Sequence, residues 1–198
     1  MSVKINPRKL NGPWADGYAL DLQTTGSTFL GYNGYGHPVF DTHRPPLGEL
    51  LHQLKNSGDQ SAVQPIVETV IDFLKTWRPR VDAIVPVPPS NTSRKHQPVT
   101  EVAVALSEQT GIPLCESCLS KVKSTGQLKD VFDFAKRAEI LSGAFSVNEK
   151  KTSGKRLLLF DDLYRSGATV STITRLLLEA GGASAVYLLT LTRTRKLL

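Results

Sequence analysis

The feature that most constrains this 198-residue chain is a continuous apolar run that ends in two carboxylates. Residues 157–162 read LLLFDD, and a loop containing small residues then leads into an amphipathic segment. A strand without alternation between apolar and polar residues is typical of a parallel sheet that helices cover on both faces. We expect this strand to stop at Asp161 and Asp162, so that neither carboxylate needs to be buried.

The segments around this run predict the same class of fold. Apolar strands are expected over 81–89, 112–120, 143–147 and 183–194, and helices over 97–111 and 167–182. Strands that alternate with helical segments of this length indicate a parallel sheet with crossover helices. We therefore predict an α/β protein whose parallel sheet is flanked by helices.

The first part of the chain has a different pattern. Residues 17–23 and 27–40 alternate and carry aromatic side chains, which predicts a β-hairpin. A helix opened by Pro45 and Pro46 and ended by Gly58 follows, and then a second helix over 61–77. We expect residues 1–43 to form an N-terminal appendage, and residues 44–198 to form the main domain.

Composition limits the partners and the compartment. The chain has 24 Lys and Arg against 18 Asp and Glu, a formal charge of +6, which favours anionic partners such as phosphorylated metabolites or nucleic acid. No apolar run is long enough for a membrane span or a signal peptide, so we expect a cytoplasmic protein without a membrane partner. Zinc ribbons need a second cysteine pair. Cys115 and Cys118 are therefore interpreted as two strand residues, with a redox pair as the alternative.

Asp161 and Asp162 lie where ligands bind in parallel sheets, at the carboxyl end of a strand. Carboxylates there can accept hydrogen bonds from sugar hydroxyls or hold a divalent cation. The loop 165–169 opens a helix, whose free N–H groups attract phosphate, and Ser166 and Thr169 add hydroxyl donors. The combination predicts a sugar-phosphate site, and the alternative is simple capping of the helix.

This stretch resembles the phosphoribosyl-pyrophosphate (PRPP) signature of type I phosphoribosyltransferases. The resemblance implies that fold, and it implies that Asp161 and Asp162 contact the ribose 2′- and 3′-hydroxyls. The residues implied to surround the 5′-phosphate are Arg165, Ser166, Gly167, Ala168 and Thr169. Two positions depart from the common pattern, since Tyr164 replaces an aliphatic residue and Arg165 a small one.

Two further segments are similar to the ComF (GntX-like) competence family. They are residues 84–114 and 121–147, and Lys121, Thr125, Gln127, Arg137 and Phe145 fall at matching spacings. Ile140 stands where that family usually has Asn. The cysteine-rich zinc module of the family is absent, and the expected hairpin occupies its place. The resemblance covers roughly residues 44–195.

The resemblance assigns further residues to the release of pyrophosphate. The loop after the first core strand would bind pyrophosphate through Pro88, Pro89, Ser90 and Asn91, with Arg94 just beyond. A flexible hood near 121–138 would close over the substrate. Its Lys121, counted with Asp161 and Asp162 as catalytic, and Lys123 would reach the pyrophosphate. Arg137 would bind phosphate or pair with Glu139 or Asp133.

The resulting prediction is a phosphoribosyltransferase, a pentosyl-type glycosyltransferase of nucleotide metabolism, that uses PRPP and an unidentified acceptor. Mg²⁺ would neutralise the leaving pyrophosphate, and Asp161 and Asp162 would contact the metal only indirectly, through PRPP or water. One alternative is a regulator that binds PRPP or a nucleotide without turnover. Another is a competence-type accessory of DNA uptake, although the basic residues are dispersed. Homodimers are common in this fold, so self-association is also considered.

Overall fold

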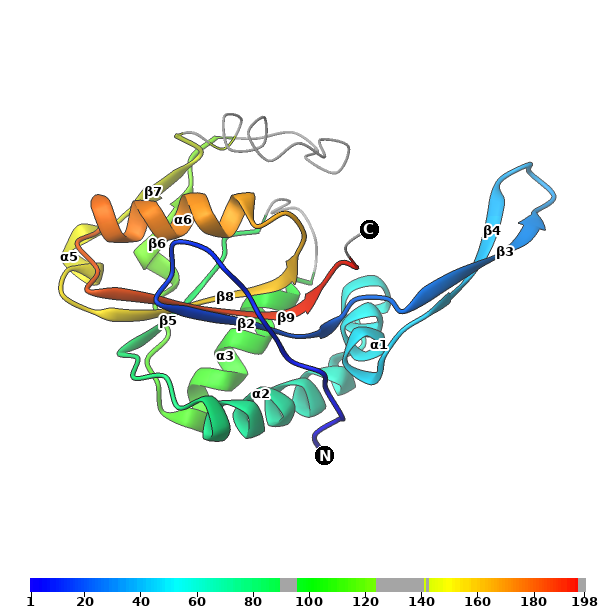
Figure 1. The fold of residues 1–198 in the computed structure, drawn as a ribbon, viewed down its shortest axis with the longest axis horizontal. Helices are drawn as coiled ribbons and strands as arrows, with labels where there is room; N and C mark the ends of the chain where they lie inside the picture. The colour runs from blue at the N-terminus through cyan, green and yellow to red at the C-terminus, as the bar shows by residue number, and fades with distance from the viewer. Residues whose placement is uncertain (90–95, 124–140, 142, 196–198) are drawn as a thin grey trace.

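The computed structural model describes residues 1–89, 96–123, 141 and 143–195 (Figure 1). Its central sheet has the strand order β1-β2-β9-β8-β5. These strands are β1 (Arg8–Lys9), β2 (Asp16–Leu22), β9 (Ala185–Arg193), β8 (Arg156–Tyr164) and β5 (Ala83–Pro86). All neighbours in the sheet are parallel except β1 and β2, which are antiparallel. The predicted parallel sheet is confirmed.

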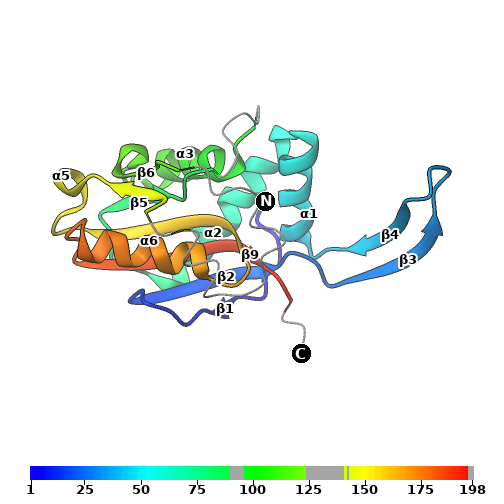
Figure 2. The ribbon, with the colours of Figure 1, turned by 90° about the horizontal axis from the view of Figure 1, so that it is seen from above.

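Helices cover both faces of this sheet (Figures 1 and 2). One face carries α1 (Pro46–His52), α2 (Val63–Trp77) and α3 (Pro98–Thr110), and the other carries α6 (Ala168–Glu179). Along β8, Leu158 and Phe160 pack in the core of the first face, whereas Leu157 and Leu159 pack in the core of the second. Burial on both faces explains the unbroken apolar run. Among the described helices, none is both long and apolar enough to cross a membrane.

The strand expected over 112–120 is largely wrong. Cys115 and Cys118 are joined by a disulfide, and a 3-10 turn, η3 (Glu116–Cys118), begins directly after Cys115 and ends at Cys118. Their Cα atoms are 5.4 Å apart, whereas an extended strand would separate them by about 10 Å. Only the end of the segment is strand, because β6 (Leu119–Lys121) pairs antiparallel with β7 (Phe145–Val147). A short helix, α5 (Glu149–Thr152), then leads towards β8.

The hairpin expected over 17–43 is wrong in its first strand. β2 pairs with β9 in the central sheet, because its neighbouring residues Ala19 and Leu20 are both buried and need cover on both faces. The hairpin of the structure consists of β3 (Gly26–Tyr32) and β4 (Pro38–His43), which pair antiparallel. The division of the chain into domains at residue 43 stays a prediction.

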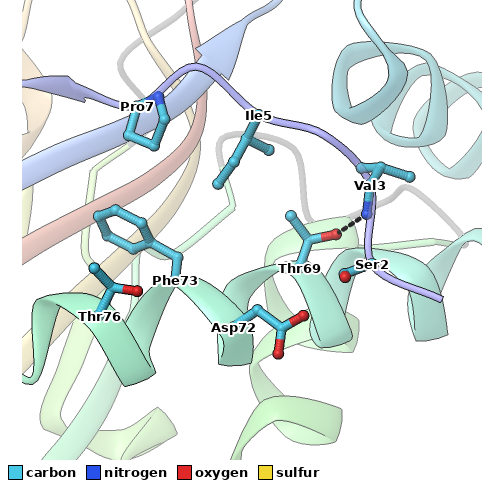
Figure 3. A pocket seen from close by; sticks show the side chains of 8 residues that line it. All are labelled: Ser2, Val3, Ile5, Pro7, Thr69, Asp72, Phe73 and Thr76. Atoms are coloured by element: carbon cyan, nitrogen blue, oxygen red, sulfur yellow. Dashed lines mark hydrogen bonds between the residues drawn. The ribbon is translucent and has the colours of Figure 1, made fainter.

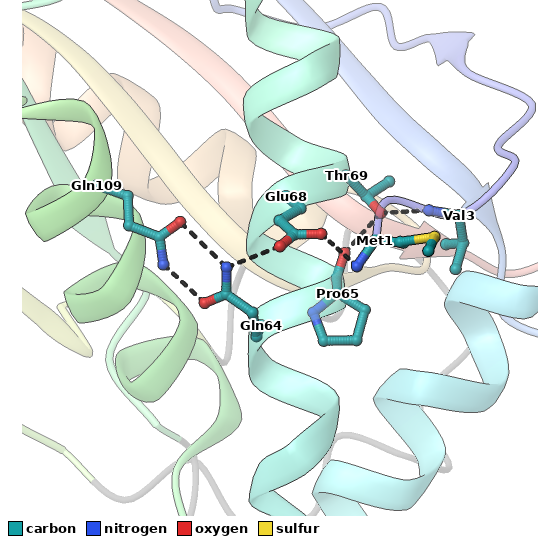
Figure 4. A network of polar contacts seen from close by, with 7 residues as sticks. All are labelled: Met1, Val3, Gln64, Pro65, Glu68, Thr69 and Gln109. Atoms are coloured by element: carbon teal, nitrogen blue, oxygen red, sulfur yellow. Dashed lines mark hydrogen bonds and ion pairs between the residues drawn. The ribbon is translucent and has the colours of Figure 1, made fainter.

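The N-terminal segment crosses α2 and leaves a hollow of about 320 Å³ beside it (Figure 3). Val3 and Ile5 line this hollow, and the Val3 N–H donates to the Thr69 hydroxyl at 2.9 Å. Polar contacts continue across α2, where Gln64 donates to Glu68 and exchanges hydrogen bonds with Gln109 of α3 (Figure 4). These contacts connect the N-terminal segment, α2 and α3 into one layer below the sheet.

Candidate functional site

The carboxyl ends of β5 and β8 lie side by side at one edge of the sheet. The Val87 N–H donates to the Phe160 carbonyl at 2.9 Å, which brings Pro88 next to the acidic pair. Pro88 and Pro89 are both half-buried. The other residues predicted for the pyrophosphate loop, Ser90, Asn91 and Arg94, lie outside the described residues. The structure therefore joins the start of the predicted loop to the acidic pair.

The prediction that the strand stops at the acidic pair is wrong, because β8 continues to Tyr164. Its partner β9 also continues, and Tyr164 pairs with Arg193. The Thr192 hydroxyl donates to the Asp162 carbonyl at 2.9 Å. Since side chains of a strand alternate between faces, Asp161 is directed towards the α6 face and Asp162 towards the face of α1, α2 and α3.

The two carboxyl groups have different surroundings. Burial raises the pKa of Asp161 well above its usual value, and the nearby charge of Asp162 raises it further. The Asp161 carboxyl accepts a hydrogen bond of 2.8 Å from the Asp162 N–H, which acts in the opposite direction. The Asp161 carboxyl is therefore protonated more readily than a solvated carboxyl would be.

Lys55 is a residue of this edge that the sequence analysis missed. It belongs to a π-helical turn, η1 (Gln53–Ser57), which continues α1 and ends at Gly58 with φ 67°. Its ammonium lies 2.5 Å from the Asp162 carboxylate, and the two side chains are 28% and 15% exposed. The sequence does not predict this contact, because Lys55 lies on the polar side of a predicted helix. At this π-helical turn the segment departs from regular α-helix, and such turns are frequent at functional sites.

The predicted phosphate loop lies at the N-terminus of α6. Gly167 has φ 79° and precedes the helix without a side-chain cap, and the Ser171 N–H donates to its carbonyl at 2.9 Å. The Ala168 N–H donates to the Ser166 hydroxyl at 3.4 Å. Arg165 is exposed and Thr169 is half-buried. All five predicted loop residues therefore meet at one helix N-terminus, where backbone N–H groups favour an anion.

Tyr164, which departs from the common signature, lies against this loop. A Cβ atom at Gly167 would come within 2.4 Å of the Tyr164 hydroxyl. Trp14 meets the Tyr164 ring edge to face, with centroids 6.4 Å apart. Burial raises the pKa of Tyr164, so its phenol stays neutral at physiological pH. The large Tyr164 side chain thus packs against Gly167 and Trp14.

The predicted hood is only partly described. Lys121 ends β6 opposite Phe145, and burial lowers the pKa of its ammonium. Lys123 is exposed, and Arg137 lies outside the described residues together with the rest of 124–140. β6 and β7 form a small sheet of their own, separate from the central sheet. The roles of Lys121, Lys123 and Arg137 stay predictions.

A direct Mg²⁺ site does not fit the residues at this edge. Within the described ranges, no group of three or more His, Cys, Asp or Glu side chains could hold a metal ion. Asp161 and Asp162 are directed to opposite faces, and Asp162 is paired with Lys55. A Mg²⁺ ion in this place would therefore depend on oxygen atoms that a phosphorylated ligand supplies.

No family model matches the sequence, and no curated protein matches it. Among solved structures, the chain is similar to glutamine PRPP amidotransferase from B. subtilis, with 18% identity and a TM-score of 0.50. The match covers 87% of this chain and 36% of that one, so this chain spans about a third of the enzyme's length. This likeness shows the fold: the chain has the type I phosphoribosyltransferase fold, as the sequence predicted.

Weaker likenesses are to two further proteins. The adenine phosphoribosyltransferase of Thermoanaerobacter pseudethanolicus has 12% identity, with a TM-score of 0.42 over 84% of this chain and 95% of that one. The UMP synthase of Leishmania donovani has 16% identity, with a TM-score of 0.44 over 84% of this chain and 28% of that one.

Proposed function

We propose that this chain binds PRPP and transfers its phosphoribosyl group to an acceptor, releasing pyrophosphate. The observation that carries the proposal is the junction of β8 and α6, where two carboxyl groups and a helix N-terminus opened by Gly167 lie within one short stretch of chain. A hydroxylated sugar that bears a phosphate needs hydrogen-bond acceptors beside an anion site. The type I phosphoribosyltransferase fold supports the same reading.

In this proposal the reaction breaks the bond between C1′ and the pyrophosphate oxygen, which keeps the electron pair, and forms a bond from C1′ to the acceptor, which loses a proton. The 5′-phosphate binds the N–H groups of residues 165–169, and ribose hydroxyls donate to Asp161 and Asp162, one of which turns from its own face of the strand towards the sugar. These contacts hold the sugar in one orientation, which lowers the entropic part of the barrier. Bound Mg²⁺ would reduce the charge of the pyrophosphate.

Lys55 adds a cation to this proposed site. Its ammonium has three donors, and one carboxylate oxygen of Asp162 uses only part of that capacity. When a ribose hydroxyl donates to Asp162, Lys55 remains within reach of a ligand that carries several negative charges. We assign it to the pyrophosphate end of the ligand, together with the loop that starts at Pro88. We also propose that the chain is related to the ComF family. This relation does not identify the acceptor.

The first experiment is calorimetric titration of the protein with PRPP, with and without Mg²⁺, and with ribose 5-phosphate. Micromolar, Mg²⁺-dependent binding of PRPP is expected, followed by release of pyrophosphate when the right base is present. Asp161→Asn combined with Asp162→Asn should abolish binding and leave the fold intact, whereas the exposed Asp72→Asn should not. Equal binding by the double variant and the parent would refute the site assignment.

A regulator that binds PRPP without turnover is the second candidate, and one observation favours it. Lys55 pairs with Asp162 within the chain, so part of the hydrogen-bonding capacity of that carboxylate is used without a sugar. Tight PRPP binding without pyrophosphate release, with any of the common nucleobases as acceptor, would support the regulator.

A further inference from the structure

The β3–β4 hairpin projects from the rest of the molecule in both views (Figures 1 and 2). We call residues 26–43 the arm. It is a separate two-stranded sheet, and none of its large apolar side chains belongs to either core of the described residues. An isolated two-stranded hairpin is only marginally stable in water, so the arm lacks the cover that such an element ordinarily needs.

Aromatic side chains gather on one face of the arm. Phe29 pairs with Phe40 across the strands, with ring centroids 5.5 Å apart, and Tyr32 meets Phe29 at 5.3 Å. Phe29, Tyr32 and Phe40 are 49%, 72% and 53% exposed, and we call these three residues the aromatic face. A bulge between Phe29 and Gly31 keeps Tyr32 on this face. Exposed apolar patches of this kind mark interaction surfaces.

The tip of the arm is held in shape before any partner binds. The Asn33 side chain accepts hydrogen bonds from the Tyr35 and His37 N–H groups, at 3.0 and 2.9 Å. The Asn33 N–H donates to the His37 carbonyl at 2.9 Å. An ordered tip presents Tyr35, which is 88% exposed, at a smaller entropic cost on binding than a loose loop would.

The charge of the arm favours some classes of partner over others. The arm has no lysine or arginine and one carboxylate, Asp41, so it lacks the cations that nucleic acid or an anionic membrane attracts. Since the whole chain carries +6 and the arm −1, the rest of the chain carries +7. Two copies would repel one another through these basic bodies. Contact through the arms, which point away from the bodies, brings two copies together with the least repulsion.

The available area fits a second arm. Four aromatic side chains, those of the aromatic face and Tyr35, offer about 500 Å² of exposed surface per arm. Two arms that cover all four of these side chains in each other would bury about 1,000 Å², which is the lower limit for a specific interface. A patch that contacts its own copy satisfies the symmetry of a twofold dimer.

We propose that two copies of this chain form a dimer through the aromatic faces of their arms, which pack on one another about a twofold axis. We expect weak association that is detectable at micromolar concentrations. The proposal is independent of catalysis and of PRPP binding, since the arm lies outside the candidate site.

Sedimentation velocity between about 1 and 100 µM tests the dimer. The parent should shift from monomer to dimer across this range. Phe29→Ser combined with Phe40→Ser should raise the dissociation constant at least a hundredfold, because buried aromatic residues dominate such contacts. The matched control is Leu30→Ser combined with Val39→Ser, which changes neighbouring residues that point away from the aromatic face and should leave the dimer intact.

Thermal unfolding and PRPP titration of each variant show whether the body of the protein is unchanged. A parent that stays monomeric at 100 µM overturns the proposal, whether or not its arm binds another macromolecule. A dimer that survives the Phe29 and Phe40 substitutions overturns it as well, because the contact then lies elsewhere.

Discussion

At the scale of single residues, the contact between Lys55 and Asp162 distinguishes this site from a bare pair of carboxylates. Lys55→Met should weaken PRPP binding about tenfold, because the ligand loses one charge-assisted contact at its pyrophosphate end. Ribose 5-phosphate, which lacks the pyrophosphate, should bind about as well to the variant as to the parent. Calorimetric titration with both ligands measures the difference.

The control for this prediction is Lys75→Met, which removes an exposed lysine that pairs with Asp72 on α2. PRPP binding should be unchanged in that variant. If Lys55→Met instead bound PRPP more tightly, the ammonium would be an obstacle to the ligand, and its assignment to the pyrophosphate would be wrong.

Gly167 is required by the backbone and by its neighbour at the same time. Its φ of 79° is unfavourable for other residues, and a Cβ would come within 2.4 Å of the Tyr164 hydroxyl. Gly167→Ala should therefore cost about 1–3 kcal/mol of unfolding free energy and should also weaken PRPP binding. Denaturant unfolding and titration of the same samples separate the two effects.

Gly154 offers a matched comparison. It has φ 71°, but nothing lies within 4 Å of an added Cβ, so Gly154→Ala carries the backbone strain without the collision. Its loss of stability should be the smaller of the two, and its PRPP binding should equal that of the parent. Equal losses at both positions would mean that Tyr164 moves aside without cost.

At the scale of elements, one ion pair connects the start of β8 to the segment that precedes β5. Arg156 donates to both carboxylate oxygens of Asp82, at 2.6 and 3.1 Å, and these hydrogen bonds lower the pKa of Asp82 to about 2. A lowered pKa stabilises the fold above the ordinary value near 3.8, and the stabilisation is lost as the pH falls towards 2.

Asp82→Asn should therefore reduce the loss of stability between pH 4 and pH 2, because the group that takes up a proton on unfolding is gone. Urea unfolding at several pH values in this range measures the slope. Arg156→Gln should flatten the slope as well, since it removes the cause of the lowered pKa. An unchanged slope in both variants would show that the pair does not persist in solution.

The disulfide between Cys115 and Cys118 closes a very short loop just before β6. By the chain-entropy relation, closing a loop of this size stabilises the fold by about 2 kcal/mol at most. Reduction should therefore lower the unfolding free energy by no more than that amount, and Cys115→Ser should behave like the reduced protein. A larger loss on reduction would mean that the turn also holds β6 and β7 in place.

Sequence reasoning succeeded where burial leaves a periodic pattern and failed where a contact is made between distant segments. The apolar run of β8 identified the parallel sheet, and the glycine after the acidic pair identified the helix N-terminus. Lys55 was missed because it lies 107 residues from Asp162 in the sequence. The π turn that positions it is not predicted by any local sequence pattern. β2 was misassigned because its partner β9 lies at the other end of the chain.

At the scale of the whole molecule, the position of β2 determines which N-terminal segments can be deleted without loss of the fold. β2 lies between β1 and β9, and its loss would expose the edge of β9, where Leu188, Leu189 and Leu191 are fully buried. The shortened chain 44–198 should therefore fail to fold cooperatively. Replacing only residues 26–43 by a short Gly-Ser turn should be tolerated, because those residues contribute to neither core.

Ligand linkage provides a common measurement for both deletions. At a PRPP concentration 100 times its dissociation constant, binding should raise the unfolding free energy by about 2.7 kcal/mol in the parent and in the variant without the arm. The chain 44–198 should show no unfolding transition and no such gain. If 44–198 did unfold cooperatively and gain the same stability from PRPP, residues 1–43 would be a separate appendage, and β2 would be dispensable to the sheet that carries the site.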